Sequence, residues 1–405
     1  MWEIPSWVIY LIFFLDFFMA FFYITILIKL KTKKAIEKYK ERTVTFIVPA
    51  YNRQDTLKKC IESIENLDYP KNKIKIIIVD DGSKDNTLKV AKNLEKKYSN
   101  IFVLTKKNGG KASAINFGIK KVKTELIAVL DADSFVEKNA LNQAMPHFMD
   151  DYTGSVTFRL KPTNTSRLIE KMQYVEYTLA GLYRKVMGHM NALPVTPAFS
   201  VFRKEVFEKY GGFDENNITE DFEMGLRIQA NHHNVGYVAN SYALTEVPNT
   251  LVKWAKQRLR WSYGTVYNYN KYKRIFFNSK YGDLGFMVLP SGLLSMLTIS
   301  LILFLGLYSM VSFSWSYIQR IMVGWVPTLS INTNLFVIPL TDLQLVLFLI
   351  SLLVGVILYL FARLELKEKI GFFSYIITLL CYVWILAIIY IYAIILFLIK
   401  KKPGW

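Results

Sequence analysis

Four short motifs in this chain place carboxylates and cations at spacings that suit chemistry on a phosphorylated donor. They are Asp80-Asp81-Gly82-Ser83, Asp131-Ala132-Asp133, Thr219-Glu220-Asp221 and Gln257-Arg258-Leu259-Arg260-Trp261. Together these residue types can hold a nucleotide, bind a metal ion, remove a proton and neutralise a departing diphosphate. Each motif alone also has a structural explanation, such as a turn or a helix cap.

Asp131 and Asp133 form the most specific pair, because they follow the apolar run 126–130 without a break. Two carboxylates separated by one residue can face a single divalent cation together with diphosphate oxygens. Hard oxygen ligands favour Mg²⁺ or Mn²⁺ at such a place. A solvated turn is the alternative.

Two segments, residues 108–112 and 257–261, contain cations that could bind the phosphates of such a donor. Asn108-Gly109-Gly110-Lys111-Ala112 precedes a predicted helix, where glycines, the helix N-terminus and the Lys111 ammonium favour an anion. In the last motif a helix would put Gln257 and Trp261 on one face, with Arg260 adjacent. Arg260 can neutralise a diphosphate, and the Trp261 ring can support a sugar. The alternatives are an ordinary loop and a basic, aromatic helix at a membrane surface.

The elements that must position these residues alternate between strand and helix. Apolar runs predict strands at 43–49, 74–79, 101–104 and 126–130, and helical spacing predicts helices at 55–67, 86–97 and 111–121. This alternation predicts a Rossmann-like α/β domain with a mostly parallel sheet, and residues 156–247 are less regular. No GxGxxG follows the first strand, which argues against a dehydrogenase.

The apolar segments indicate a membrane protein with a soluble middle. Residues 7–30, 286–311, 342–361 and 372–399 are long enough to cross a bilayer, and 52% of the chain is apolar. Residues 7–30 carry their basic cluster on the C-terminal side, so they predict a retained helix rather than a signal peptide. The same cluster places the soluble part on the cytoplasmic side of the cell membrane. We expect four regions: an N-terminal transmembrane helix (1–30), the cytoplasmic domain (31–250), amphipathic interfacial helices (251–283) and a C-terminal transmembrane region (284–405).

A formal net charge of +18 over 405 residues admits nucleic acid, anionic lipid or a phosphorylated substrate as partner. The membrane segments argue against nucleic acid, and the basic residues gather beside those segments, as membrane lipids or phosphorylated substrates would require. Cys60 and Cys381 lie in different regions, so no disulfide is expected. The chain can be a monomer or a homo-oligomer.

The ordered motif set over residues 43–270 resembles family 2 inverting glycosyltransferases, the GT-A group of cellulose, chitin, hyaluronan and poly-N-acetylglucosamine synthases. The resemblance implies a UDP-sugar donor and a divalent metal. It also implies that Asp133 binds the metal, that Asp221 beside Glu220 is the general base, that Thr219 caps the following helix, and that residues 195–203 line the acceptor site. The donor-binding residues that it implies are Pro49, Tyr51, Asp80 (on uracil), Lys111, Asp131, Gln257 and Arg258, with Arg260 on the diphosphate and Trp261 beneath the acceptor.

Three functions follow as hypotheses. The first is a processive synthase that extends a polysaccharide and passes it through its own membrane segments. The second is a lipid glycosyltransferase that adds one or a few sugars to a membrane lipid. The third is a membrane channel or scaffold whose soluble domain is inactive, against which the intact acidic set argues.

Overall fold

Four parallel strands form one half of a central sheet, as the apolar runs predict. They are β1 (Val44–Ala50), β2 (Ile74–Asp80), β3 (Ile101–Thr105) and β4 (Leu126–Leu130). The computed structural model describes residues 6–30, 39–324, 343–369 and 371–404, and over these the strand order is β3-β2-β1-β4-β7-β6-β8-β5. Val44 pairs with Ile74 on one side and with Leu126 on the other, so the strands end at a common edge.

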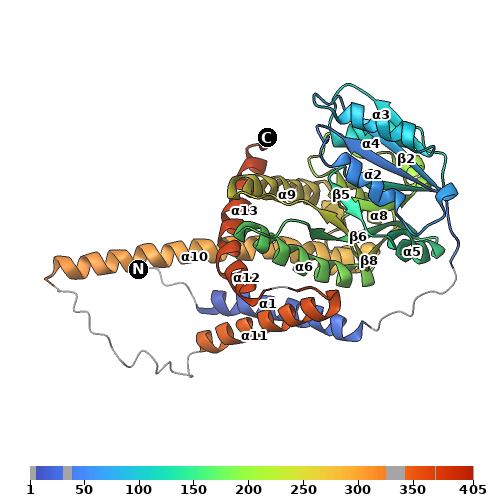
Figure 1. Ribbon diagram of the computed structural model, residues 1–405. Helices are drawn as coiled ribbons and strands as arrows, with labels where there is room; N and C mark the ends of the chain where they lie inside the picture. Colours follow the sequence, from blue (N-terminus) through green and yellow to red (C-terminus); the bar gives the residue numbers. More distant parts are fainter. Residues whose placement is uncertain (1–5, 31–38, 325–342, 370, 405) are drawn as a thin grey trace.

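Helices cover both faces of this parallel half (Figure 1). Phe46 and Ile78 point into a core shared with α2 (Leu57–Glu65) and α3 (Thr87–Lys97). Ile47 and Val79 point into a second core, shared with α4 (Lys111–Ile119) and α8 (Glu220–Ala230). Burial on both faces explains why these strands are apolar at consecutive positions rather than at alternate ones.

The other half of the sheet contains long strands that the sequence does not reveal. β7 (Phe199–Arg203) runs antiparallel to β4 and to β6 (Thr153–Pro162), and β8 (Asn234–Thr245) pairs with β6 and with β5 (Ser134–Val136). β6 and β8 have 10 and 12 residues, where the sequence indicated only short strands. The reason is that Ser155, Thr157 and Arg159 are buried in β6 and interrupt its apolar run. The short helices α5 (Ala140–Ala144) and α7 (Lys204–Tyr210) flank this half.

Three described helices are long and apolar enough to cross a membrane. They are α1 (Ser6–Lys29), α10 (Leu289–Met322) and α11 (Leu343–Leu366), with apolar stretches at Tyr10–Lys29, Leu284–Met322 and Leu349–Leu366. α1 and α11 lie side by side, and α6 (Leu168–His189) packs on them through Val175, Leu182 and Val186. α6 therefore links the soluble domain to the apolar helices.

The fourth apolar segment, residues 372–399, is divided into α12 (Phe372–Ile377), a π-helical turn (Thr378–Tyr382) and α13 (Val383–Leu398). Its apolar helix, Trp384–Leu398, is shorter than the other three stretches. α13 packs along α9 (Leu251–Lys271), and just before α13 the ring of Tyr382 lies 4.9 Å from the ring of Trp254 on α9. α9, which carries the last motif, is thus in direct contact with the C-terminal apolar helix (Figure 1).

Candidate active site

The motif residues of the parallel strands lie together at the carboxyl edge of the sheet. Pro49 is the second-to-last residue of β1, and Tyr51 follows that strand with 40% of its surface exposed. Asp80 ends β2 and pairs in register with Ala50, and Asp131 directly follows β4. Open α/β sheets bind their ligands at this edge.

The two aspartates at the end of β2 make different contacts. Asp80 is buried and accepts hydrogen bonds from the Ser83 amide (3.4 Å) and the Thr105 hydroxyl (3.5 Å). Asp81 accepts from the amides of Gly109 (3.0 Å) and Gly110 (2.8 Å). Asp81 therefore fixes the glycine loop before α4. This role of Asp81 was not predicted from the sequence, although the doublet Asp80-Asp81 already pointed to a second functional aspartate.

Lys111 brings three motifs together at the N-terminus of α4. Its ammonium lies 2.6 Å from Asp131 Oδ1 and 3.5 Å from Glu220 Oε1. Burial alone would lower the pKa of Lys111, but the nearby charges of Asp131, Glu220 and Asp221 outweigh burial and raise it. Lys111 is therefore a fixed cation among carboxylates.

Asp133 lies beside Asp131 and pairs with Arg53 at 3.2 Å. Burial raises the pKa of Asp133, and the like charge of Asp131 raises it further. A site with this electrostatic character favours an additional cation. No group of three or more His, Cys, Asp or Glu side chains that could hold a metal occurs among the described residues.

Glu220 and Asp221 form the first turn of α8. Burial raises the pKa of Glu220, against the opposing charge of Lys111. Asp221 Oδ1 accepts a hydrogen bond from the Phe222 amide at 2.8 Å, and the Asp221 carbonyl accepts one from the Thr196 hydroxyl at 2.8 Å. The Asp221 carboxylate is thus held on a rigid element beside Lys111.

The expectation that Thr219 caps α8 is wrong. Thr219 occupies the N-cap position, but its side chain makes no capping hydrogen bond. Its hydroxyl instead accepts from the Asn268 amide group of α9 at 3.0 Å. The Thr219 side chain bonds to α9 because that helix packs directly against the turn before α8.

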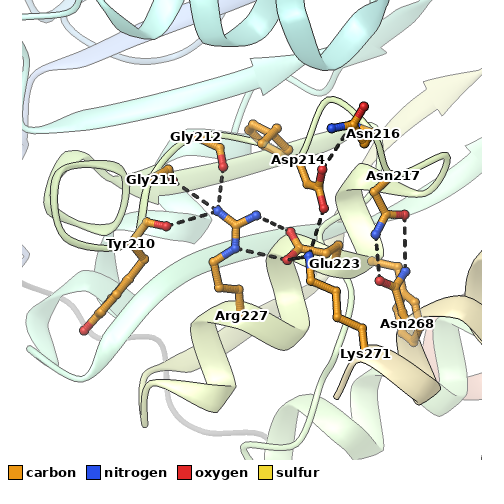
Figure 2. A network of polar contacts seen from close by, with 12 residues as sticks. Tyr210, Gly211, Gly212, Asp214, Asn216, Asn217, Glu223, Arg227, Asn268 and Lys271 are labelled. Carbon is orange, nitrogen blue, oxygen red and sulfur yellow. Dashed lines mark hydrogen bonds and ion pairs between the residues drawn. The ribbon is translucent and has the colours of Figure 1, made fainter. Parts of the chain in front are cut away.

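A polar network joins α8 to α9 (Figure 2). The carboxylate of Glu223, on α8, is fully buried and accepts from Arg227 and from Lys271, whose ammonium is 2.9 Å away. Asn217, just before α8, donates to the Asn268 side-chain oxygen at 2.7 Å. Arg260 of α9 donates to the Ile218 carbonyl at 3.2 Å. The network therefore fixes the helix of the last motif against the turn that carries Asp221.

Part of this chain is similar to a known protein family. Residues 45–211 match the family described as Glycosyl transferase family 2. A mannosyltransferase, PcManGT from Pyrobaculum calidifontis, solved in complex with GDP-Man and Mn²⁺, is similar in structure with a TM-score of 0.63. The similarity covers 95% of this chain and 96% of that one at 16% identity, so it shows the fold of the domain and its helices.

Curated relatives with similar sequences are poly-beta-1,6-N-acetyl-D-glucosamine synthases. The synthase of Staphylococcus aureus (strain MSSA476) is 31% identical over 226 residues, which cover 55% of this chain and 54% of the relative. That of Staphylococcus epidermidis (strain ATCC 35984) is 30% identical over 224 residues, with the same coverage. The match spans about half the length of these relatives, and it confirms the resemblance expected from the motifs.

The glycosyltransferase domain meets α9 at a point where only glycine fits. A Cβ on Gly264 would lie 2.2 Å from the Thr219 hydroxyl and 2.8 Å from the Thr219 Cβ. We expect Gly264→Ala to cost about 1–3 kcal/mol of stability through overpacking, and to lower the transfer rate by displacing Asp221. Thermal unfolding in detergent and steady-state release of nucleotide measure the two effects.

Gly306→Ala is the matched control for this change, because its Cβ on α10 would meet only Trp384, at 3.6 Å. It should leave both the unfolding temperature and the rate close to those of the parent chain. A Gly264→Ala variant that behaves like Gly306→Ala would contradict the close approach of α9 to Thr219.

Arg258, expected to bind the donor, lies inside the junction between α9, α6 and the π-helical turn before α13. Its guanidinium pairs with Glu176, donates to the Tyr382 hydroxyl at 3.1 Å and to Gln257 at 2.7 Å, and stacks 4.1 Å from the Trp261 ring. The side chain is only 3% exposed. These contacts orient Trp261 and hold Gln257 at the same junction.

Arg258→Met should destabilise the protein by about 3 kcal/mol, because it leaves the Glu176 carboxylate without its buried partner. We expect a lower unfolding temperature of the purified full chain. Adding Glu176→Gln should recover part of the loss, since the unpaired charge is then removed. A double variant no more stable than Arg258→Met would argue that the pair is not the source of the effect.

A cavity of about 820 Å³ adjoins the glycosyltransferase domain at Asp221 and Trp261. Its walls come from α1, α6, α9, α10 and α11, and its side chains are mostly apolar and aromatic. Val195 and Pro197 line it, whereas Phe199–Arg203 is the buried strand β7. The cavity thus extends from the carboxylate on α8 into the helices that are apolar enough to cross a membrane. The tyrosines in its wall are Tyr23, Tyr177, Tyr183, Tyr269 and Tyr375.

Proposed function

We propose that this chain is a membrane-embedded inverting glycosyltransferase that moves a sugar from a UDP-sugar to a growing polysaccharide. The proposal places the family 2 domain on the cytoplasmic side of a multi-pass membrane protein and couples synthesis to export. The named activity of the staphylococcal relatives supports a polymer product. The described basic residues that follow α1, Lys40 and Arg42, support the cytoplasmic side.

One observation carries the proposal: Lys111 joins Asp131 and Glu220, and the adjacent Asp221 lines a cavity shared with the apolar helices. A donor diphosphate at the sheet edge would then face fixed cations, while an acceptor in the cavity would face Asp221. Donor diphosphate and acceptor hydroxyl would then lie on opposite faces of the anomeric carbon, as single displacement requires.

In the reaction, Asp221 removes the proton from the attacking acceptor hydroxyl while the bond between the anomeric carbon and the diphosphate breaks. General base catalysis of this kind contributes about 10²- to 10⁴-fold to a rate. Glu220, beside Asp221, holds Lys111 in place near the donor. Arg260 offers its guanidinium to the departing diphosphate, whose charge rises as the bond breaks. Trp261 lies in the cavity wall, where its ring can support the acceptor sugar.

Mg²⁺ or Mn²⁺ fits the residues at the end of β4. Asp133 would bind it, with Asp131 contacting the sugar or nucleotide nearby. The observation in favour is that the carboxylates of Asp131 and Asp133 repel each other there, and that both are hard oxygen ligands of the kind that these metals prefer. The metal would neutralise charge on the diphosphate. The Mn²⁺ in the structurally similar mannosyltransferase is consistent with this choice.

A lipid acceptor is the second candidate, favoured by the mostly apolar wall of the cavity. In that case one or a few sugars would be added to a membrane lipid at the level of α9. Polymer and lipid acceptors would use the same carboxylate cluster, so the product distinguishes them.

The deciding experiment incubates the purified full chain with labelled UDP-glucose, UDP-N-acetylglucosamine or UDP-glucuronate and measures UDP release. Product size is then read by gel and by solvent extraction. We expect a long, water-soluble product from one donor. A short, organic-soluble product would establish the lipid acceptor, and no UDP release from any donor would refute sugar transfer from UDP.

A further inference from the structure

A second pocket, of about 630 Å³, lies where the soluble domain meets the link between α11 and α12. It is bordered by the end of β6, the start of α6 and the residues that follow α11. None of its lining residues also lines the cavity at Asp221. The proposed sugar transfer therefore makes no use of this pocket.

The pocket is strongly basic. Lys161, Lys171 and Lys369 line it, and its described lining contains no carboxylate. Glu368, next to the lining residue Lys369, is buried and already shared by Arg159 (3.1 Å) and Lys161 (3.0 Å). Within the described ranges, no carboxylate lies within ion-pair distance of Lys171 or Lys369, and both side chains are exposed. The site thus holds more positive charge than the protein neutralises.

Hydroxyl groups and apolar rings complete the surroundings. Thr163, Thr165 and Ser374 line the pocket and can donate to an anion. Phe372 and Phe373 lie between the lining residues Gly371 and Ser374, and are 55% and 75% exposed. Lys369 follows the apolar helix α11 by three residues. Cations just beyond an apolar helix, beside exposed rings, suit a molecule that is anionic at one end and apolar at the other.

We propose that this pocket binds the phosphate of an anionic phospholipid headgroup, with Lys171 and Lys369 as its principal ligands. The lipid chains would lie along Phe372, Phe373 and α11. A free phosphate ester shares the headgroup chemistry but has no use for the exposed rings. The binding fastens the soluble domain to the membrane beside the start of α6.

The test measures phosphatidylglycerol binding to the purified full chain in detergent by native mass spectrometry. Each basic residue near a membrane surface contributes about fivefold to such binding, so Lys171→Gln with Lys369→Gln should weaken it roughly 25-fold. Lys89→Gln with Lys96→Gln removes the same charge from exposed positions on α3 and should leave binding unchanged. Lys171→Arg with Lys369→Arg should retain binding, which separates lost ligands from a damaged fold.

Two further probes identify the source of the phosphate. Phosphatidylcholine should bind without dependence on these lysines, because its headgroup carries no net charge. If soluble glycerol phosphate displaces phosphatidylglycerol, and if this displacement depends on the same lysines, the site is supported and a free phosphate ester is enough to fill it. If glycerol phosphate does not displace phosphatidylglycerol, the lipid is supported as the ligand. Equal phosphatidylglycerol affinity in the pocket variant and the α3 control would overturn the proposal.

Discussion

Asp221→Asn should lower kcat for sugar transfer by about 10²- to 10⁴-fold and leave UDP binding intact. The substitution keeps the size of the side chain, and the amide oxygen of Asn can still accept the Phe222 amide hydrogen bond. What it removes is the ability to take a proton from the acceptor hydroxyl. Steady-state UDP release measures kcat, and isothermal titration with UDP measures the binding that should survive.

Two variants make this result specific to Asp221. Asp151→Asn changes a side chain that is 96% exposed and should leave kcat unchanged. Glu220→Gln weakens the contact with Lys111, so it should act mainly on donor binding and raise KM. Near-normal turnover of Asp221→Asn would remove Asp221 from the role of general base, whatever the other two variants do.

Asp133→Asn should lower kcat/KM by about 10²- to 10³-fold and abolish the dependence of UDP binding on Mg²⁺ or Mn²⁺. The change takes away a formal charge that the metal needs, while the similar size of Asn preserves the packing after β4. Activity measured against metal concentration, and UDP titrations with and without a chelator, record the two effects.

Arg53→Gln tests the same site, but this substitution should strengthen metal binding instead of weakening it. Arg53 pairs with Asp133 at 3.2 Å, so its guanidinium competes with a metal for that carboxylate. Its removal should lower the metal concentration needed for half-maximal UDP binding. Asp55→Asn, an exposed position on the same loop, serves as the neutral control. Metal-dependent UDP binding that persists in Asp133→Asn would exclude Asp133 as the metal ligand.

The parallel half of the sheet could be predicted because its strands are buried on both faces. Such burial demands consecutive apolar residues, and those runs end at the positions of Asp80 and Asp131. The antiparallel half was not predictable in the same way. The buried Thr157 hydroxyl, for example, bonds to Phe199 and Ser200 across the sheet, and a single sequence does not contain such pairings.

The residue types available for chemistry, and those among them that end a parallel strand, can be predicted from the amino-acid order, because strand ends and apolar runs are local properties. Tertiary structure decided the rest. It assigned Asp81 to the glycine loop, turned the Thr219 hydroxyl to Asn268, and buried Arg258 against Glu176. These contacts join segments far apart in the chain, and the last two depend on α9, which supplies Asn268 and Arg258.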